Sequence, residues 1–189
     1  QTTNAVGAGI TQPLLNECKK LGVRLVNRAM FDSLIFDDKG KVAGAKIREG
    51  YYFGRGKEGS PINVRSARGV LVATGGFARN VGLRSAQDPT LTAEVGSTNP
   101  PNATGEGLLE LFDVGAVPVH MAHIQTGPWA SADEDGFGYV SNYSIYNFAH
   151  SISVYPKTGK RFMNEIADRK TRSDAQLQCR DDAGNPLPP

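Results

Sequence analysis

The sequence contains few cysteines, almost no net charge and no long apolar stretch. Its 189 residues include only two cysteines, Cys18 and Cys179, which lie far apart, so a disulfide-rich scaffold is excluded. The formal net charge of +2 is too small to indicate a nucleic-acid partner or an anionic membrane surface. No stretch has the roughly 18 consecutive apolar residues of a membrane-spanning helix, so no membrane span is predicted.

A recognisable metal site is also lacking. The three histidines, His120, His123 and His150, are not combined with carboxylates or thiols at a ligand spacing. The acidic run 133–136 lacks the alternate-position ligands and the distal glutamate of a calcium loop. The sequence therefore predicts no bound metal ion.

The N-terminal third of the chain is predicted to form one helix followed by β-hairpins. Apolar residues at helical spacing, Cys18 among them, predict a helix over 6–21 that buries this thiol. Turn residues 37–40 predict a first hairpin, and the glycine-rich segment 54–59 predicts a second. Runs of β-branched and aromatic residues predict the strands, at 23–26, 30–36, 42–48, 51–53 and 62–64.

The segment GVLVATGGFARN, residues 69–80, is the most informative in the chain. Its apolar run 70–73 does not alternate with polar residues and stops at Thr74-Gly75-Gly76, which is typical of a strand buried on both faces. Glycines there let backbone N–H groups approach a dinucleotide closely, because no Cβ intervenes. An ordinary strand-to-helix turn fits the same residues, so this segment alone does not decide between the two.

A second polar segment, STNPPNATGEG from Ser97, leads into a predicted helix. After the irregular residues 81–103, Thr104 is expected to cap a helix that runs from Gly105 or Glu106 to 114. Glycine amides and a helix N-terminus suit polar or anionic ligand groups, and the Glu106 carboxylate suits ribose hydroxyls. The alternative is that Glu106 only balances the helix dipole.

The composition changes near residue 122, where aromatic residues become frequent, and we expect a domain boundary there. Beyond it, TGKRFMNE places the adjacent cations Lys160 and Arg161 after a turn at Thr158-Gly159. A guanidinium in this place can clamp a substrate carboxylate or stabilise developing negative charge, although most such pairs are solvated surface.

Four motifs, ATGGFARN, STNPPNATGEG, HIQTGP and TGKRFMNE, occur here in the order found in the flavoprotein subunits of the fumarate reductase and succinate dehydrogenase family. The chain resembles the flavocytochrome c fumarate reductases most, and 3-ketosteroid dehydrogenases and urocanate reductases are related. The resemblance implies a mixed α/β fold with β-hairpins. Residues 1–121 would be the middle portion of an FAD-binding domain, and residues 122–189 the N-terminal part of an α+β capping domain.

The resemblance also implies which residues meet FAD and substrate. In this family the arginine of the GKRF-type motif is taken as the proton donor opposite the flavin hydride, and Arg161 matches it. Gly127 stands where the fumarate enzymes have a substrate-binding histidine, and Ile145 and Phe148 match their proton-relay positions. The expected FAD contacts are Thr74, Gly75, Gly76, Thr98, Gly105 and Glu106, with the backbone of Met30 at the adenine.

The resemblance, with its departures at Gly127, Ile145 and Phe148, implies an FAD-dependent enzyme that reduces an activated C=C bond. Its substrate would be an enoate or a ketone other than fumarate. Gly127 opens space, and Trp129, Tyr146 and Phe148 could line it for a bulkier, less charged or aromatic substrate. The alternatives are a 3-ketosteroid dehydrogenase-like desaturase and a non-catalytic protein that keeps the flavin scaffold.

The family's pyrophosphate-binding strand and GxGxxG turn are not in this sequence, and neither are its C-terminal active-site histidine and arginine. We therefore expect an internal portion of a longer protein that by itself neither holds FAD tightly nor turns over. The electron donor would be a haem domain or a separate reductase. Family members work in the periplasm and in the cytoplasm, so the compartment stays open.

Overall fold

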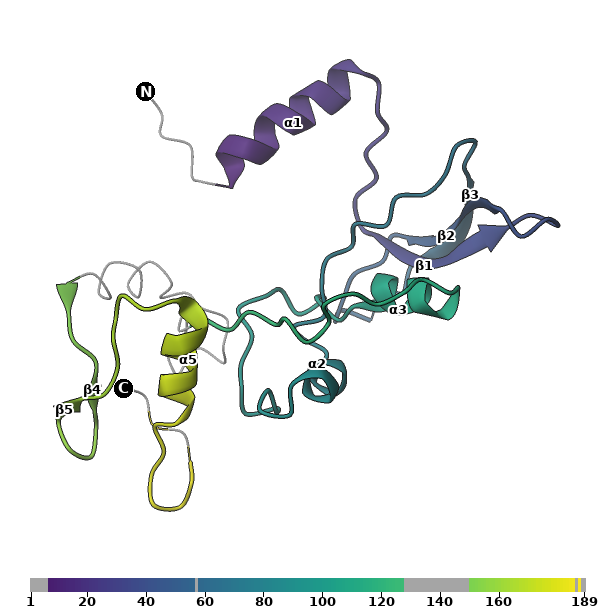
Figure 1. The fold of residues 1–189 in the computed structure, drawn as a ribbon. Helices are drawn as coiled ribbons and strands as arrows, with labels where there is room; N and C mark the ends of the chain where they lie inside the picture. The colour runs from purple at the N-terminus through teal and green to yellow at the C-terminus, as the bar shows by residue number, and fades with distance from the viewer. Residues whose placement is uncertain (1–6, 57, 128–149, 186, 188–189) are drawn as a thin grey trace. The chain divides into compact units, whose positions relative to one another are not determined.

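The computed structural model describes residues 7–56, 58–127, 150–185 and 187 (Figure 1). The chain forms two compact units, Gln1–Leu71 and Val72–Pro189, which are described here one at a time. The fold is of the expected mixed α/β type with antiparallel strands. No helix among the described residues is long and apolar enough to cross a membrane. The second unit includes both sides of the boundary predicted near residue 122, which stays a prediction.

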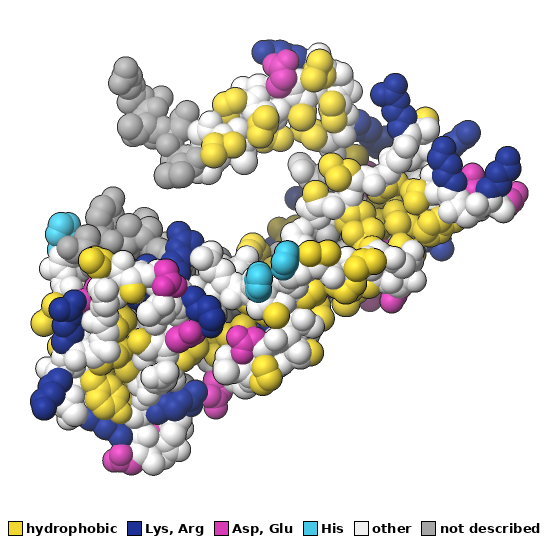
Figure 2. Space-filling view, viewed as in Figure 1, with side chains coloured by type: hydrophobic (Ala, Val, Ile, Leu, Met, Phe, Trp, Pro, Cys, Tyr) yellow, Lys and Arg dark blue, Asp and Glu magenta, His cyan; other side chains and the backbone are white. Residues whose placement is uncertain are grey.

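The first unit begins with α1, Ala8–Lys20, which confirms the predicted helix and accommodates Pro13 in its second turn. Lys19 and Lys20 occupy the last turn, where cations favourably oppose the carbonyl end of the helix dipole. The expectation that Cys18 is buried is wrong in this structure, because no residue of α1 is buried and Cys18 is half-buried. Ile10, for example, is 64% exposed, and Figure 2 shows apolar side chains along the visible side of this helix.

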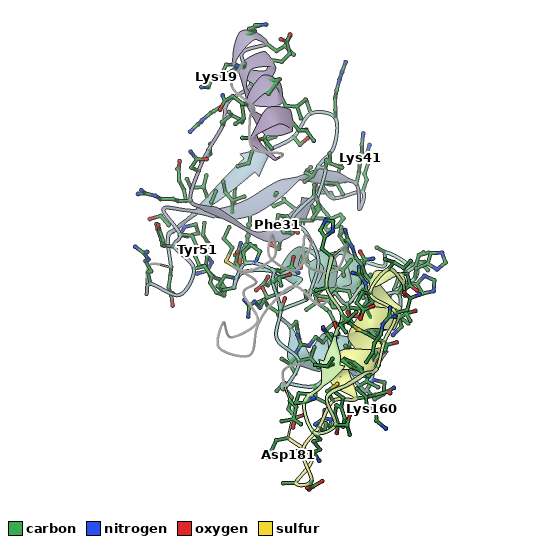
Figure 3. The ribbon with its side chains drawn as sticks, turned by 90° about the vertical axis from the view of Figure 1, so that its left-hand side faces the viewer. Lys19, Phe31, Lys41, Tyr51, Lys160 and Asp181 are labelled. Carbon is green, nitrogen blue, oxygen red and sulfur yellow. The ribbon has the colours of Figure 1, made fainter. Side chains whose placement is uncertain are left out.

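A three-stranded antiparallel sheet follows, in the order β1-β2-β3, with β1 at Ala29–Phe36, β2 at Val42–Glu49 and β3 at Ser60–Arg65. The turn between β1 and β2 confirms the first predicted hairpin. Its Asp37 carboxylate accepts hydrogen bonds from the amides of Lys39 and Lys41, both at 2.9 Å. In Figure 3 the labels Phe31 and Lys41 mark β1 and this turn.

The second hairpin differs from the prediction. Residues 62–64 belong to β3, which pairs with β2 from Gly44↔Arg65 to Glu49↔Ser60, and not with residues 51–53. The reason is that β2 offers a complete edge for six residue pairs, whereas residues 51–53 form no strand. Tyr52 instead lies beneath the guanidinium groups of Arg28 and Arg55, at 5.5 and 4.6 Å from its ring centre.

Two predicted strands, 23–26 and 70–73, are absent from the structure. Leu71 is 91% exposed, so the expected burial of the second run is also wrong here. A strand exists only when its backbone groups pair with a neighbour, and no described residue pairs with either segment. Their composition is that of strands, but the partners that would make them strands are not among the described residues.

The second unit carries three helices and a short hairpin among its described residues: α2 at Val81–Gln87, α3 at Glu106–Asp113, α5 at Arg169–Leu177, β4 at Val154–Tyr155 and β5 at Lys160–Arg161. Helix α2 lies in a region that the sequence predicted to be irregular. It begins where the Asn80 side chain accepts a hydrogen bond from the Leu83 amide at 2.9 Å. Asp168 caps α5 in the same way, through the Thr171 amide at 3.0 Å.

Helix α3 starts as predicted at Glu106 and ends before Gly115, but its cap is not Thr104. The N-cap is Gly105, which has a left-handed φ of 81° and gives no side-chain cap. The Thr104 hydroxyl bonds the Asn102 carbonyl at 3.4 Å instead. The left-handed turn at Gly105 is what aims the chain into the helix, and glycine adopts it without a steric cost.

The two hydrogen bonds of the Asn80 side chain can be tested separately by mutation. Replacing Asn80 with Ala removes both the α2 cap and the bond from its amide nitrogen to the Thr104 carbonyl at 3.1 Å. We expect a loss of about 1–2 kcal/mol in the free energy of unfolding, measured by urea denaturation. Asn80→Ser keeps a cap acceptor but has no donor for the Thr104 carbonyl, so it should retain about half of that stability. Equal losses in both variants would contradict this assignment of the cap.

Candidate functional site

The motifs ATGGFARN and STNPPNATGEG lie side by side in the second unit. The Arg79 amide donates to the Ala103 carbonyl at 2.9 Å, and the Arg79 side chain donates through Nε to the Asn99 carbonyl at 2.9 Å. Next to them, the Asn80 amide group donates to the Thr104 carbonyl. Three hydrogen bonds therefore join two segments that are about 20 residues apart in the sequence.

Close packing of glycine reinforces this junction at the start of α3. A Cβ on Gly107 would lie 2.2 Å from the Thr74 hydroxyl oxygen and 3.2 Å from a Val72 methyl carbon. A Cβ on Gly105 would lie 2.8 Å from the Cβ of Phe77. Both positions therefore need glycine for packing within the protein. Packing therefore explains why residue 105 is glycine, in addition to the predicted contact with a cofactor.

Five of the predicted FAD contacts, Thr74, Gly75, Gly76, Thr98 and Glu106, are each exposed, and together they are called the open polar surface. A Cβ on Gly75 or Gly76 would meet no atom within 4 Å, so the backbone is accessible from that side. Accessible glycine amides and a carboxylate at a helix start are groups that bind a nucleotide phosphate and ribose. The surface therefore fits the predicted cofactor. Met30 lies on β1 in the first unit, half-buried and paired with Arg48.

The second group of predicted site residues lies around hairpin β4–β5, which Lys160 marks in Figure 3. The predicted turn at Thr158-Gly159 is confirmed, since the amides of both residues donate to the Tyr155 carbonyl at 3.1 and 2.8 Å. This turn brings Arg161 opposite Val154 in the two-stranded pairing.

Arg161 is held by a buried carboxylate. Its Nη2 and Nε donate to Glu165 Oε2 at 2.5 and 3.1 Å, and the Ser153 amide donates to Glu165 Oε1 at 2.7 Å. These donors lower the pKa of Glu165 to about 2, with the hydrogen bond from Arg161 as the largest cause. The same bond raises the pKa of Arg161, which makes its guanidinium a weaker proton donor than an unpaired one. Its side chain nevertheless stays 55% exposed.

Arg169 is a cation that sequence reasoning missed. It is the first residue of α5 and donates from Nη1 to Gln125 Oε1 at 3.5 Å, a long hydrogen bond that connects α5 with HIQTGP. One signal in the sequence could have found it. A cation in the first turn of a helix opposes the helix dipole, so a residue of this type directly after a capping Asp is not explained by helix stability.

The predicted substrate residues are described only in part. Gly127 is half-buried, and beside it the Thr126 hydroxyl is buried and has no hydrogen-bond partner among the described residues. Phe148, Trp129 and Tyr146 lie outside the described residues. The rings of His120 and His123 are stacked with centres 4.9 Å apart, and no cluster of metal-ligating side chains is present in the part of the chain that the structure describes.

Comparison with known proteins shows the family to which the chain belongs. The sequence model of a family described as an FAD binding domain matches residues 1–186. The chain belongs to this FAD binding domain family. The family assignment supports FAD as the cofactor and agrees with the accessible backbone at Gly75 and Gly76.

Two relatives with similar sequences are reductases by name. The chain is 68% identical over all of its length to the acrylate reductase flavoprotein subunit of Shewanella woodyi, of which it covers 37%. It is 33% identical over 175 residues to a fumarate reductase (cytochrome) of Shewanella frigidimarina, covering 91% of this chain and 28% of the relative. The chain thus spans little more than a third of the length of the first of these relatives and less of the second.

Solved structures give the same family. The open conformation of a flavocytochrome c3 fumarate reductase superposes with a TM-score of 0.71 and 25% identity, over 94% of this chain and 29% of that one. A 3-ketosteroid-Δ4-(5α)-dehydrogenase from Rhodococcus jostii superposes with a TM-score of 0.60, also at 25% identity, over 88% of this chain and 29% of that one. The family resemblance inferred from the four motifs is confirmed.

The buried carboxylate of Glu165 makes stability depend on pH. A folded-state pKa lowered from 4.5 to about 2 stabilises the fold above pH 4.5, and this contribution is lost as the pH falls towards 2. We expect the free energy of unfolding of the wild type to fall more steeply between pH 4.5 and 2 than that of Glu165→Gln. Urea denaturation at several pH values measures both slopes. Asp113→Asn, which removes an exposed carboxylate, is the control; identical slopes in wild type and Glu165→Gln would contradict the assignment.

Proposed function

We propose that the chain is part of an FAD-dependent oxidoreductase that reduces the activated C=C bond of a small enoate. The observation that carries this proposal is the hydrogen-bonded junction of ATGGFARN and STNPPNATGEG, which brings together two motifs that both carry exposed predicted FAD contacts. Support also comes from the high identity to the acrylate reductase flavoprotein subunit over the full length of this chain.

FAD would lie on the open surface, with the backbone of Gly75 and Gly76 and the side chains of Thr74, Thr98 and Glu106 as its contacts. When bound, FAD supplies the hydride to the substrate alkene. The protein's own contribution at this surface is to hold the nucleotide through amides and a carboxylate whose positions are fixed by the buried Gly105 and Gly107.

The substrate would carry fewer carboxylates than fumarate. Gly127 replaces the histidine that the fumarate enzymes are inferred to use for a substrate carboxylate, and glycine has no side chain to bind one. A monocarboxylate enoate needs no such group. Acrylate, which the name of the 68% identical relative gives, has this chemistry. A bulkier enone would also gain space at Gly127, and this is the alternative outcome of the test.

Two arginines are candidates for the proton donor. Arg161 is the residue that the GKRF-type motif designates, but its bond with Glu165 raises its pKa. Arg169 is favoured by its contact with Gln125, because Gln125 belongs to the segment where the resemblance places the substrate carboxylate. A guanidinium beside the alkene would stabilise the carbanion character that hydride addition creates, and would pass on a proton.

Electrons would reach FAD from a separate haem protein or domain, or from a reductase. Relatives support both routes by their names, among them the fumarate reductase (cytochrome) and an NADH:fumarate oxidoreductase of Klebsiella pneumoniae at 29% identity.

Oxidation of the reduced flavin by a panel of acceptors tests this function. With the full-length FAD-loaded protein, we expect acrylate to reoxidise the flavin at least tenfold faster than fumarate, urocanate or a steroid enone. Absorbance at the oxidised flavin band measures each rate. Reoxidation by the steroid enone alone would favour the desaturase class, and no reoxidation by any acceptor would favour a non-catalytic flavin scaffold.

Substitution of the two arginines separates chemistry from positioning. We expect Arg169→Gln to lower kcat by about 10²–10⁴-fold with FAD still bound, because the general acid is lost. Arg161→Gln and Glu165→Gln should each lower kcat by a smaller and similar factor, and their double variant by no more than either alone. Steady-state kinetics with acrylate measures these effects. A larger loss in Arg161→Gln than in Arg169→Gln would return the role of acid to Arg161.

A further inference from the structure

Arg84 is a buried cation on α2 that donates to four backbone carbonyls. Its side chain is 5% exposed. Nε donates to Leu91 O at 3.0 Å, Nη1 to Ala78 O at 2.9 Å, and Nη2 to Thr92 O at 2.6 Å and to Val95 O. One guanidinium thus joins the end of ATGGFARN with the turn that precedes STNPPNATGEG.

This arrangement is unusual for a buried charge, because the partners described for Arg84 are neutral carbonyls rather than a carboxylate. Burial lowers the pKa of Arg84, and the nearby positive charge of Arg79 lowers it further. A guanidinium has several donors that diverge within one plane, and here they reach two separate backbone segments, at Ala78 and at 91–95, whereas a lysine ammonium is a compact point charge. The shape of the group therefore matters here besides its charge.

Three of the four carbonyls that Arg84 holds, those of Leu91, Thr92 and Val95, lie directly before STNPPNATGEG. Leu91 is 3% exposed and also accepts a hydrogen bond from the Ser85 hydroxyl at 2.8 Å. Farther along, the buried Ser97 accepts from the Asn99 amide at 3.3 Å, and Asn99 is in turn held by Arg79. The backbone from 91 to 103 is therefore fixed at several points by side chains of residues 79–85.

We propose that Arg84 is a positioning residue for the FAD site, which fixes residues 91–103 so that Thr98 and the following turn are preorganised for the nucleotide. Arg79 is the second anchor of the same segment. This inference rests on the proposed function, because it assumes that STNPPNATGEG meets FAD. A polar segment with two prolines and no strand of its own would otherwise have to be ordered on binding, which would weaken affinity.

The experiment compares FAD binding in full-length holoprotein variants. We expect Arg84→Lys, which keeps the charge but not the fork, to raise the FAD dissociation constant at least tenfold. Arg79→Lys should raise it by a smaller factor, because the bond from the Arg79 backbone amide remains. Arg24→Lys, at an exposed position in the first unit, is the matched control and should bind as the wild type does. Flavin fluorescence on titration of the deflavinated proteins measures the affinities.

Two further measurements separate positioning from general loss of stability. Hydrogen exchange of the FAD-free Arg84→Lys protein should accelerate at the amides of 91–103 and remain unchanged in β1–β3. For Arg84→Ala, millimolar methylguanidinium should restore FAD affinity and slow exchange at 91–103 together, because the added cation can donate to the same carbonyls. Should Arg84→Lys not fold, Arg79→Lys and its exchange pattern test the same proposal.

An FAD dissociation constant within twofold of the wild type in Arg84→Lys would overturn the inference, as would exchange that accelerates uniformly. These outcomes are distinguishable from failure of the proposed function. That function fails when the wild type binds FAD but no enoate reoxidises it, whatever Arg84 does.

Discussion

Hydrogen bonds from side chains to backbone carbonyls are what the described site depends on. Arg79, Asn80 and Arg84 direct their donors at carbonyls between 91 and 104, and these bonds join two motifs that no sheet connects. Loops carry unpaired backbone acceptors, and an acceptor without water or a partner is costly. Side chains on and next to a seven-residue helix satisfy them here. The polar surface above can then stay open to a ligand.

In TGKRFMNE, the Arg161–Glu165 pair likewise gives a buried polar group its hydrogen-bond partners. A carboxylate that is 4% exposed is tolerated because a guanidinium and the Ser153 amide satisfy it. The pair ties β5 to the chain that leads into α5, and the Arg172 side chain adds a bond to the Glu165 carbonyl at 3.2 Å. Arg161, the arginine that the motif designates, is thus held by Glu165. Arg169, on the adjoining helix, contacts HIQTGP instead.

The predictions that succeeded rest on local chemistry. The β1–β2 hairpin follows from the Asp37 turn, α1 from its apolar spacing, and the turn before β5 from Thr158-Gly159. Those that failed concern long-range partners. The runs 23–26 and 70–73 have strand composition but no described neighbour, and β3 joined β2 because that edge was available. Helix α2 was missed although its cap, Asn80, is local, because the helix is short and ends just before Pro89 in a segment interpreted as irregular.

The sequence by itself determined the family and hence the cofactor, because four short motifs in one order require no coordinates to be recognised. It also determined which residues are glycine, and so where backbone can be approached closely or turn left-handed, as at Gly105. Only the tertiary structure decided which oxygen atoms each arginine side chain binds. The partners of Arg84, Arg161 and Arg169 lie 4 to 44 positions away, and spacing along a chain does not encode which distant oxygen a guanidinium will reach.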